Sequence, residues 1–502
     1  MSKIVLLPLD ERPCNYIYPK LLPTGNLNIC LPPQSILGKK KIPGDFKKIS
    51  AWLLEETKDA DFVIISLDTL LFGGIVPARI NHLTLEEIRN RVQIVTKIRQ
   101  QNPRIKIFAN ELIMRCPSYS LSDEEPDYFD LYGKEIFRYG QILDMKSQGM
   151  MTYDLQKELE RLIDKIDPVA LKDYMDRRKV NISILLENLN LVATKVIDFF
   201  IIPQDDSNEY SFSSIDQKKV RDYICQNHIE DNIIMYPGAD EVGLTLIARA
   251  VNQINGIKPK IMVYYSSSTG QFVIPSFEDR IIDETVKYQI YAIGGIRVNS
   301  ASECDILLGI NIGSQMLTKN DKRVDVVYGK NRNLLTFIDY MDYGKKSNKI
   351  VGIADVAYCN AADEELMILL RNRKMLYAID AYAGWNTSSN TLGTVLSTLS
   401  CYRATHDERK KMEFLTYRYF EDYGYMAIVR EAIAKQVGQM EGSTRFDLGV
   451  NYDFLLKKTR EMLGIHMQTF FPEIYDKIAK MTISFPWNRL FEIMLKLDFK
   501  DE

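Results

Sequence analysis

Residues 62–69 read Phe-Val-Ile-Ile-Ser-Leu-Asp-Thr, a continuous apolar run that ends in an acidic residue and a hydroxyl residue. A run without polar alternation is typical of a strand that is covered on both faces of a parallel sheet. The same pattern recurs along most of the chain, and each run is followed by polar residues and then by a segment with helical periodicity. The expected strands are residues 4–9, 62–67, 105–109, 196–202, 232–236, 260–265, 305–311, 349–354 and 376–379, with a weak candidate at 296–299. This alternation predicts an α/β fold with parallel strands.

Helix start signals stand between the expected strands. Thr84 and Glu87 have the spacing of a capping box, and Ile88, Val92 and Val95 then fall on one helical face. Nine or ten strands are more than a (β/α)8 barrel needs. We expect a barrel-like arrangement of the TIM type, with an open sheet split into two doubly wound halves as the alternative.

Two regions lack the strand pattern. Residues 117–195 predict a helical insertion, with helices at 153–166 and 180–192, and residues 401–502 predict a helical, highly charged C-terminal region. We therefore expect an α/β catalytic domain over residues 1–400, interrupted by the insertion, and a C-terminal region from residue 401.

The composition excludes several classes of protein. Apolar residues make up 46% of the chain and charged residues 26%, with 64 Lys and Arg against 67 Asp and Glu. A nucleic-acid partner is not expected, because the basic excess of such binders is missing. No apolar stretch approaches the roughly 20 residues of a membrane-spanning helix, and the N-terminal residues lack the long apolar region of a signal peptide. We expect no membrane partner and a cytoplasmic location, while the sequence does not indicate an oligomeric state.

The cysteines and histidines also exclude familiar sites. The seven cysteines are scattered without a C-x-x-C pair, which argues against a disulfide framework and a structural zinc site. The four histidines are widely spaced and none follows a strand, which argues against a catalytic triad. Cys14 follows the first strand but has no identifiable base. Glycine-rich nucleotide motifs and a G-x-S-x-G nucleophile motif are missing.

Acidic and amide residues follow most of the expected strands. In both barrels and open parallel sheets, ligands bind at the carboxyl ends of the strands, so these residues predict an acidic cleft. The candidate substrate-binding residues are Asp10, Arg12, Asn15, Asp68, Asn110, Glu111, Asp240, Glu241, Asp380, Tyr382, Trp385, Asn386 and Asn390. Aspartate is also a preferred helix N-cap, a role that suits Asp240, Asp355 and Asp363.

Asp205 and Asp206 are the predicted catalytic residues. They are adjacent and follow the fourth expected strand, at residues 196–202. A neighbouring like charge raises the pKa of one carboxyl, which can then act as a general acid at neutral pH.

Several blocks of the chain resemble a bacterial family that is known as a domain of unknown function. They are Leu-Pro-Leu-Asp-Glu-Arg-Pro-Cys-Asn at 7–15, Pro-Gly-Ala-Asp-Glu-Val-Gly at 237–243, Gly-Trp-Asn-Thr at 384–387, Asn-Thr-Leu-Gly-Thr at 390–394 and Pro-Trp-Asn-Arg at 486–489. The resemblance covers nearly the whole chain and implies that the blocks form one site or one core. It implies no activity.

The adjacent aspartates are also similar to the Asp-Asp pair of barrel glycosidases that cleave N-acetylhexosaminides with help from the acetamido group of the substrate. This resemblance implies that Asp205 orients the acetamido nitrogen and that Asp206 protonates the leaving oxygen. Trp385 and Tyr382 would then stack on a sugar ring, while Asn386 and Asn390 would bind its hydroxyl groups. The rest of that family's pattern is missing from this chain.

The leading hypothesis is therefore a glycosidase-like hydrolase that acts on a small sugar conjugate, such as an N-acetylhexosaminide, without a cofactor. One alternative is a hydrolase, lyase or isomerase that holds a divalent metal with the same carboxylates, because oxygen ligands suit hard cations. Another is a ligand-binding protein without catalytic activity.

Overall fold

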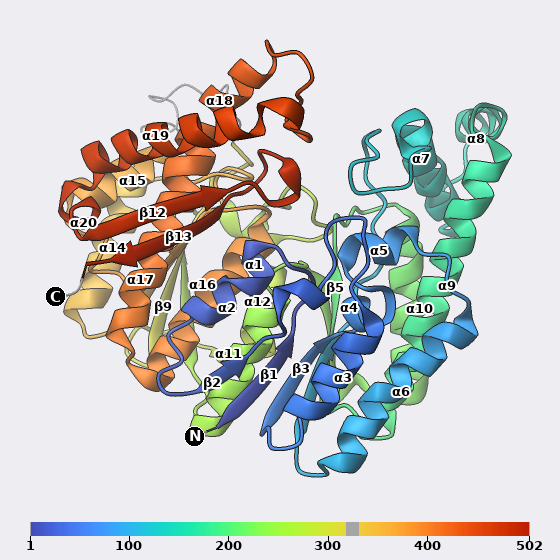
Figure 1. Ribbon diagram of the computed structural model, residues 1–502, viewed down its shortest axis with the longest axis horizontal. Coiled ribbons are helices and arrows are strands. Elements are labelled where there is room, and N and C mark those ends of the chain that lie inside the picture. The colour runs from blue at the N-terminus through green and yellow to red at the C-terminus, as the bar shows by residue number, and fades with distance from the viewer. Residues whose placement is uncertain (1, 318–330, 501–502) are drawn as a thin grey trace. The chain divides into compact units, whose positions relative to one another are not determined.

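The computed structural model describes residues 2–317 and 331–500, which divide into two compact units, each with its own parallel sheet. The first unit comprises the residues up to Glu11, Leu27–Leu246 and Phe277–Arg280 (Figure 1). The second comprises Arg12–Asn26, Ile247–Ser276 and the residues from Ile281 onward. The boundaries of these units differ from the domain boundary that the sequence predicts between residues 400 and 401.

The first unit contains six parallel strands. They are β1 (Lys3–Leu7), β2 (Asn28–Cys30), β3 (Phe62–Ser66), β4 (Lys106–Asn110), β5 (Phe199–Gln204) and β6 (Ile233–Pro237), in the order β2-β1-β3-β4-β5-β6. Every residue of β3 and β5 is buried, which explains why these strands have no polar alternation. Because all the strands are parallel, their carboxyl ends lie along one edge of the sheet.

Helices connect these strands. They are α3 (Phe46–Glu56), α4 (Leu67–Phe72), α5 (Ile75–Ile80), α6 (Leu85–Gln101) and α10 (Phe212–Asn227), with the short 3-10 turns η1 (Gln34–Ile36) and η2 (Glu230–Asn232). The predicted capping box is confirmed at the start of α6. The backbone nitrogen of Glu87 donates to Oγ1 of Thr84 at 3.2 Å, and the backbone nitrogen of Thr84 donates to Oε2 of Glu87 at 2.8 Å.

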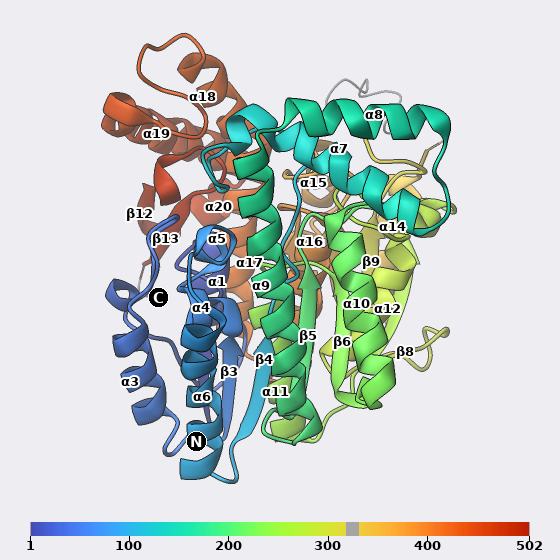
Figure 2. The same cartoon turned by 90° about the vertical axis from the view of Figure 1, so that its right-hand side faces the viewer.

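A helical segment separates β4 from β5, where the sequence predicts an insertion. Its helices are α7 (Phe129–Ser147), α8 (Tyr153–Lys165) and α9 (Pro168–Ala193). Helices α7 and α9 lie beside α10, and α8 contacts α7 (Figure 2). Phe129, Ile136 and Tyr174 form a buried apolar cluster with Phe212 of α10. The insertion therefore has an apolar core that it shares with α10.

The second unit contains five parallel strands. They are β7 (Lys260–Tyr265), β8 (Ile296–Arg297), β9 (Ile306–Asn311), β10 (Ile350–Asp355) and β11 (Ala381–Ala383), in the order β11-β10-β9-β7-β8. When the strands are numbered within this unit, the order is 2-1-3-4-5, which is also the order of the first five strands of the first unit. The weak strand expected near residue 296 is confirmed as β8.

Helices cover both faces of the second sheet. A Cβ atom on Gly352 of β10 would lie 2.7 Å from Leu399 of α16 (Ser388–Thr405), and one on Gly309 of β9 would lie 2.6 Å from Met341 of α14 (Leu334–Lys346). Gly309 is opposite Ile353 in the ladder, so Gly309 and Gly352 face opposite sides of the sheet. The two glycines therefore allow close approach of one helix on each face.

The prediction of a single barrel is wrong. Among the described strands, pairing joins neither β2 to β6 nor β11 to β8, and the eleven parallel strands form two open sheets. The alternative of two doubly wound halves matches this arrangement. The strand expected at 376–379 is also wrong, because β11 begins at Ala381.

The second unit and its C-terminal region contain further helices. They are α1 (Pro13–Tyr16), α2 (Tyr18–Leu21), η3 (Gly270–Phe272), α12 (Ile282–Ala292), α15 (Glu364–Asn372), α17 (Glu408–Arg418), the π-helix η4 (Tyr419–Val429), α18 (Arg430–Val437), η5 (Gly449–Asn451), α19 (Tyr452–Phe470), α20 (Pro472–Tyr475) and η6 (Pro486–Asn488). Helix α11 (Val242–Asn255) contains the boundary between the units. The expected helical tail also contains two antiparallel strands, β12 (Ile478–Ser484) and β13 (Met494–Phe499), that the sequence reading missed. In the ranges 2–317 and 331–500, no helix is both long and apolar enough to cross a membrane.

Candidate functional site

The carboxyl edge of the first sheet carries the acidic and amide residues that the sequence predicts there. They are Asp10 after β1, Asp68 in the first turn of α4, Asn110 and Glu111 at the end of β4, Asp205 and Asp206 after β5, and Asp240 and Glu241 after β6. All of them except Asp205 and Asp206 are buried, and these two are partly exposed. The pair with the strongest catalytic prediction is therefore also the pair that a dissolved molecule can reach.

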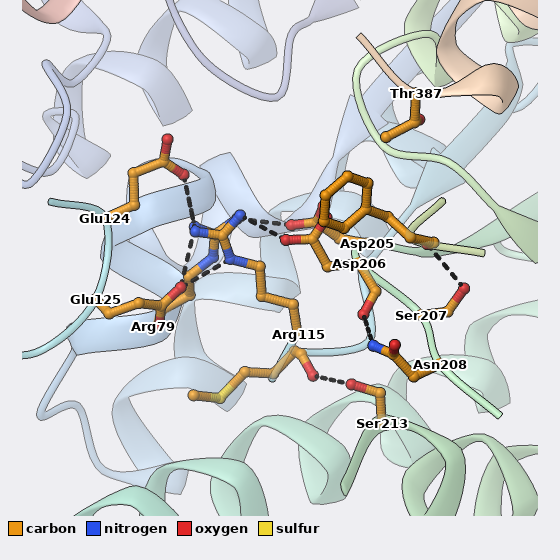
Figure 3. A network of polar contacts seen from close by, with 12 residues as sticks. Arg79, Arg115, Glu124, Glu125, Asp205, Asp206, Ser207, Asn208, Ser213 and Thr387 are labelled. Atoms are coloured by element: carbon orange, nitrogen blue, oxygen red, sulfur yellow. Dashed lines mark hydrogen bonds and ion pairs between the residues drawn. The ribbon is translucent and has the colours of Figure 1, made fainter. Parts of the chain in front are cut away.

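Two arginines contact this aspartate pair. Nη2 of Arg79 donates to Oδ2 of Asp205 at 2.7 Å, and Nη1 of Arg115 donates to Oδ2 of Asp206 at 3.1 Å (Figure 3). Arg79 belongs to α5, whereas Arg115 follows β4. The arginine side chains are only 4% and 9% exposed. Each aspartate is therefore in contact with a buried arginine.

Two glutamates complete the network on the other side of the arginines. Oε2 of Glu124 accepts from Nη1 of Arg79 at 2.9 Å and from Nη2 of Arg115 at 3.1 Å. Oε1 of Glu125, a fully buried side chain, accepts from Nε of Arg115 at 2.7 Å. Four carboxyl groups thus surround two guanidinium groups, and this excess of negative charge favours a proton on one carboxyl.

Asp206 is the carboxyl group of this network whose pKa is raised. Burial raises the pKa of Asp206 to about 7, with a further contribution from the charge of Asp205, while Arg115 and Arg79 act in the opposite direction. An aspartate in water has a pKa of about 3.9. A large fraction of Asp206 is therefore protonated at neutral pH, as a general acid must be.

One oxygen of each aspartate is left for a bound molecule. Among the described residues, the side-chain hydrogen bonds and ion pairs of Asp205 and Asp206 involve Oδ2 alone. Their side chains are 17% and 15% exposed. The backbone of Asp206 has a φ of 42°, a left-handed conformation that is uncommon outside glycine, and its carbonyl oxygen accepts from Nδ2 of Asn208 at 3.3 Å.

The enclosed space beside the pair is small. A cavity of about 10 Å³ lies between α5, the segment after β4 and Asp205, with Asp68, Arg79 and Arg115 in its wall. This volume holds about one water molecule. This cavity is therefore too small for an organic substrate.

An exposed aromatic residue stands next to the pair. The carbonyl oxygen of Phe277 accepts from Oγ of Ser207 at 3.4 Å, and Ser207 directly follows Asp206. Phe277 is 39% exposed and has a φ of 68°, which is a true outlier for a bulky side chain. Strained backbone of this kind is concentrated at functional sites, so Phe277 is a candidate surface for the apolar face of a ligand.

Three other acidic residues of this edge, Asp68, Glu111 and Glu241, make internal contacts. Oδ2 of Asp68 accepts from the backbone nitrogen of Leu112 at 3.0 Å, and Oε2 of Glu111 accepts from Nδ2 of Asn188 at 2.7 Å. Burial raises the pKa of Asp68 to about 7 and that of Glu111 well above its usual value. Burial also raises the pKa of Glu241 to about 8, and Oε2 of Glu241 accepts from the backbone nitrogen of Ala239 at 3.0 Å. Their raised pKa values favour the uncharged form, and all three side chains belong to the core.

The remaining predicted residues lie in the second unit, and Asp380 is at the wrong edge of its sheet. It precedes β11, and its Oδ2 accepts from the backbone nitrogen of Val351 near the start of β10 at 2.8 Å. Asp380 also forms ion pairs with Lys345 at 2.5 Å and Lys411 at 3.4 Å. The prediction of a strand-end ligand is wrong here, because the strand begins after Asp380 instead of ending before it.

Tyr382 and Trp385 cannot stack on a sugar ring. Trp385 is 3% exposed, its Nε1 donates to Oγ1 of Thr394 at 3.1 Å, and its ring meets that of Tyr18 edge-on at 5.3 Å. Tyr382 is 2% exposed and its hydroxyl donates to Asp355 at 2.7 Å. Both rings are core residues, so their predicted role as sugar platforms is wrong.

The polar residues of the other motif blocks are also engaged in packing. Arg12 is 5% exposed and its guanidinium group lies 4.8 Å from the ring centre of Trp487. Asn15 is buried next to Cys14, and the buried Asn390 donates from Nδ2 to Oγ1 of Thr387 at 3.1 Å. Asn386 has a φ of 54°.

Asn386 accepts a hydrogen bond at its backbone oxygen from the nitrogen of Asn360 at 2.9 Å, as expected of a turn residue. Asp363 is confirmed as a helix N-cap, because its Oδ1 accepts from the backbone nitrogen of Glu365 at the start of α15.

The described residues offer no suitable donor set for the divalent metal of the alternative hypothesis. Within the described part of the chain, no group of three or more His, Cys, Asp or Glu side chains is arranged to hold a metal ion. One oxygen of Asp205 and one of Asp206 contact Arg79 and Arg115, and the positive charge of these arginines repels a cation. Acid–base chemistry by the side chains therefore fits these residues better than a metal site does.

Sequence reasoning missed the arginines and glutamates of the network. A signal was present for both arginines. Arg79 lies in Ile-Val-Pro-Ala-Arg-Ile at 75–80 and Arg115 in Leu-Ile-Met-Arg-Cys at 112–116, each a single charge in an apolar run. Such an arginine is buried only with a partner. The sequence contains no comparable signal for Glu124 and Glu125.

Comparison with known proteins gives a family but no named activity. Neither a curated protein nor a solved structure matches the chain. One family model matches residues 4–496, which is nearly the full length, and its description is "Protein of unknown function (DUF4127)". The expected membership in a domain-of-unknown-function family is thereby confirmed, and the chain belongs to the DUF4127 family.

Proposed function

We propose that the first unit is a hydrolase that cleaves the glycosidic bond of a small sugar conjugate by general acid–base catalysis. The proposal rests on Asp206, a carboxyl group with a pKa of about 7 beside the ion-paired carboxylate of Asp205. Cleavage of a glycosidic bond requires a protonated carboxyl group to transfer its proton to the leaving oxygen. Asp206 meets this requirement at neutral pH and reaches solvent.

The contacts of Asp206 suit a group that first donates a proton and later accepts one. Asp206 transfers its proton to the glycosidic oxygen as the bond from that oxygen to the anomeric carbon breaks. The resulting carboxylate is stabilised by Arg115, whose Nη1 lies 3.1 Å from Oδ2. Asp206 then takes a proton from the water molecule that attacks the anomeric carbon, and the acid is restored.

Asp205 has a different role in this proposal. Its ion pair with Arg79 at 2.7 Å fixes the carboxylate next to the acid. A fixed carboxylate there accepts a hydrogen bond from an N–H group of the substrate, as the acetamido group of an N-acetylhexosaminide provides. As the glycosidic bond breaks, the acetamido oxygen forms a bond to the anomeric carbon, and the attacking water molecule later breaks that bond, which is the substrate-assisted variant of glycoside hydrolysis.

The resemblance to barrel glycosidases supports this proposal less than the local geometry does. The pair follows β5 of an open six-stranded sheet, and it does not follow the fourth strand of a barrel. The similarity is therefore limited to two adjacent carboxyls. Phe277, which is 39% exposed beside Ser207, replaces Trp385 and Tyr382 as the candidate platform for the sugar ring.

A panel of aryl and alkyl glycosides that includes N-acetylhexosaminides tests the proposal. We expect turnover of at least one N-acetylhexosaminide at neutral pH. Asp206→Asn should reduce kcat by about 10²–10⁴-fold on alkyl glycosides, whose leaving group needs a proton. The loss should be much smaller on nitrophenyl glycosides, whose leaving group is stable as an anion.

Asp127→Asn is the matched control, because Asp127 is 96% exposed and forms only a surface ion pair with Lys41. It should behave as the wild type on every substrate. An enzyme that turns over no member of the panel, or an Asp206→Asn variant with equal losses on alkyl and nitrophenyl glycosides, would contradict the proposed role.

A further inference from the structure

The second unit has an unassigned crevice at the point where its strand order reverses. The first strand of this unit in chain order, β7, lies between β8 and β9, so the connections from β7 and β9 leave the sheet on opposite sides of a gap. In open α/β sheets, ligands bind outside the carboxyl ends of the strands at such a switch point. The topology therefore selects the loops after β7 and β9.

These two loops line a crevice of about 590 Å³. Its wall consists of Thr269, Phe272, Val273, Ile274, Ser276, Ser314, Gln315 and Met316. The volume is in the range of small-molecule sites. Phe272 and Ile274 are 63% and 55% exposed, so the crevice presents apolar side chains to solvent. An apolar body of a ligand would be buried against them.

A buried arginine lies at the base of the same two loops. The side chain of Arg332 is fully buried, and its Nη1 contacts Oδ2 of Asp363 at 2.5 Å and Oδ1 of Asn311 at 2.7 Å. Asn311 is the last residue of β9, and its Oδ1 also accepts from Oγ of Ser266, which directly follows β7, at 3.1 Å. Arg332 thus contacts the end of β9 directly and is linked through Asn311 to the first residue of the loop after β7.

Part of the guanidinium group of Arg332 lacks hydrogen-bond partners among the described residues. Nε and Nη2 of Arg332 have no hydrogen-bond partner among the described residues, although both are buried. Buried donors without a partner are rare and costly, because desolvation is not compensated. Nε and Nη2 form the side-on edge of the guanidinium group, which matches two oxygens of a carboxylate or a phosphate.

The residues on either side of Arg332 connect it to the crevice. Oδ1 of Asn331 accepts from Oγ of Ser314, a crevice residue, at 2.8 Å. The backbone nitrogen of Asn333 donates to the carbonyl oxygen of Ser266 at 2.9 Å. The residues directly before and after Arg332 are therefore hydrogen-bonded to the two loops, one residue to each loop.

The loop after β7 is rich in hydroxyl groups and comes close to the loop after β9. It reads Ser-Ser-Ser-Thr-Gly at 266–270, and Oγ of Ser267 lies 3.4 Å from Oγ1 of Thr269. A Cβ atom on Gly270 would lie 2.5 Å from Ile312, so only glycine allows this approach. Hydroxyl groups and backbone N–H groups of such loops can donate to an oxyanion.

We propose that the switch point of the second unit binds a small organic oxyanion, a phosphate ester or a carboxylate. The oxyanion completes the hydrogen bonds of Nε and Nη2 of Arg332, and the apolar body lies in the crevice against Phe272 and Ile274. This site is separate from the chemistry proposed for Asp205 and Asp206, and neither proposal requires the other.

Calorimetric titration of the full chain with phenyl phosphate, benzoate and inorganic phosphate tests the proposal. We expect saturable binding of phenyl phosphate or benzoate, and the tighter of the two identifies the oxyanion. Arg332→Gln should weaken that binding at least about tenfold, because it removes charge-assisted hydrogen bonds. Arg373→Gln is the matched control, since Arg373 is 52% exposed and forms a surface ion pair with Asp339.

Two further variants keep the test decisive if Arg332→Gln does not fold. Arg332→Lys preserves the charge but not the side-on pair of donors, and should also weaken binding. Phe272→Ala leaves Arg332 intact and should weaken binding of phenyl phosphate or benzoate more than that of inorganic phosphate. The proposal is overturned if neither aromatic probe binds at millimolar concentration, or if both Arg332→Lys and Phe272→Ala bind as tightly as the wild type.

Discussion

Arg115 donates from Nη1 to Oδ2 of Asp206 across 3.1 Å, while its Nε and Nη2 contact Glu125 and Glu124. One guanidinium group thus contacts three carboxyl groups, so its positive charge stabilises each of them only in part. This sharing explains why burial and Asp205 raise the pKa of Asp206 to about 7 although an arginine is in contact with it. The proposed acid depends on this shared arginine.

Arg115→Lys should move the pH dependence of the proposed hydrolysis. The protonated form of Asp206 is the active acid, so kcat/KM of the wild type should fall as the pH rises through about 7. A lysine cannot contact three carboxyls in the geometry of a guanidinium group, so Asp206 should lose its proton at a higher pH and the decline should shift upward. The pH profile of kcat/KM measures this shift.

Arg138→Lys is the control for that substitution, because Arg138 forms a two-pronged ion pair with Glu158 and is 38% exposed. Its pH profile should coincide with that of the wild type. A decline at the same pH in the Arg115→Lys enzyme would show that Arg115 does not set the ionisation of the catalytic group.

Phe277→Ala should raise KM by about tenfold with little change in kcat. A residue that binds the substrate and its transition state equally contributes to KM alone. Phe277 is 39% exposed next to Ser207 and lies outside the arginine–carboxylate network. Steady-state kinetics on the best glycoside of the panel give both constants.

Trp385→Phe is the comparison, because Trp385 was the aromatic residue that the sequence favoured and it is only 3% exposed. This variant should be less stable by about 1–3 kcal/mol, through the loss of packing and of the hydrogen bond to Thr394. Its KM should not change. The reverse result, an altered KM for Trp385→Phe and a normal one for Phe277→Ala, would exchange the two assignments.

Asp380→Asn should affect stability and leave catalysis intact. Asp380 lies at the amino edge of the second sheet and pairs with Lys345 and Lys411, whose side chains are 27% and 8% exposed. Removal of the carboxylate leaves Lys411 buried without that partner, and we expect a loss of about 2–3 kcal/mol. Denaturant unfolding should show this loss, while kcat/KM of the folded protein stays at the wild-type value.

Asp342→Asn removes a similar but exposed ion pair, with Lys346, and should change stability by less than about 1 kcal/mol. Loss of activity in a folded Asp380→Asn protein would mean that Asp380 has a functional role after all.

Glu241→Gln should flatten the dependence of stability on pH. Burial raises the pKa of Glu241 to about 8, so the folded chain holds this proton more tightly than the unfolded chain does. Stability from this group is complete below the unfolded pKa and is lost as the pH rises through about 8. Glutamine cannot ionise, so the variant should lack this component, which is worth about 1.4 kcal/mol per pH unit between the two pKa values.

Denaturant unfolding at a series of pH values between 5 and 8 measures the slope. The control is Glu160→Gln, since Glu160 is exposed on α8 and its substitution should leave the slope as in the wild type. Equal slopes for wild type and Glu241→Gln would mean that Glu241 is ionised in the folded protein.

The sequence predicted the parallel strands and their acidic ends well, for a physical reason. Strands such as β3 are buried on both faces and therefore have an unbroken apolar pattern, and the residue after such a strand must be polar or a turn former. This local rule placed Asp68, Glu111 and the Asp205–Asp206 pair at the carboxyl edge of the first sheet. It could not distinguish one closed sheet from two open ones, because strand order depends on contacts between distant segments.

The errors at Asp380 and Trp385 have the same origin. A short apolar stretch before Asp380 is a turn, and the actual strand is the three-residue β11 that follows it. Trp385 follows a strand end, yet its ring turns inward against Tyr18, which is 367 positions away in the chain. The partners of Asp205 and Asp206 are equally remote, since Arg79 and Arg115 reach the pair from other elements. No local pattern contains such information.

The ionisation of Asp206 itself tests the central claim most directly. Carbon-13 NMR of protein labelled at the aspartate carboxyl carbon would follow its titration, and the signal that is missing from Asp206→Asn identifies the residue. The account predicts a titration midpoint near pH 7, as burial and the charge of Asp205 require. A midpoint near the ordinary aspartate value of about 3.9 would mean that Asp206 is ionised at neutral pH and cannot be the acid.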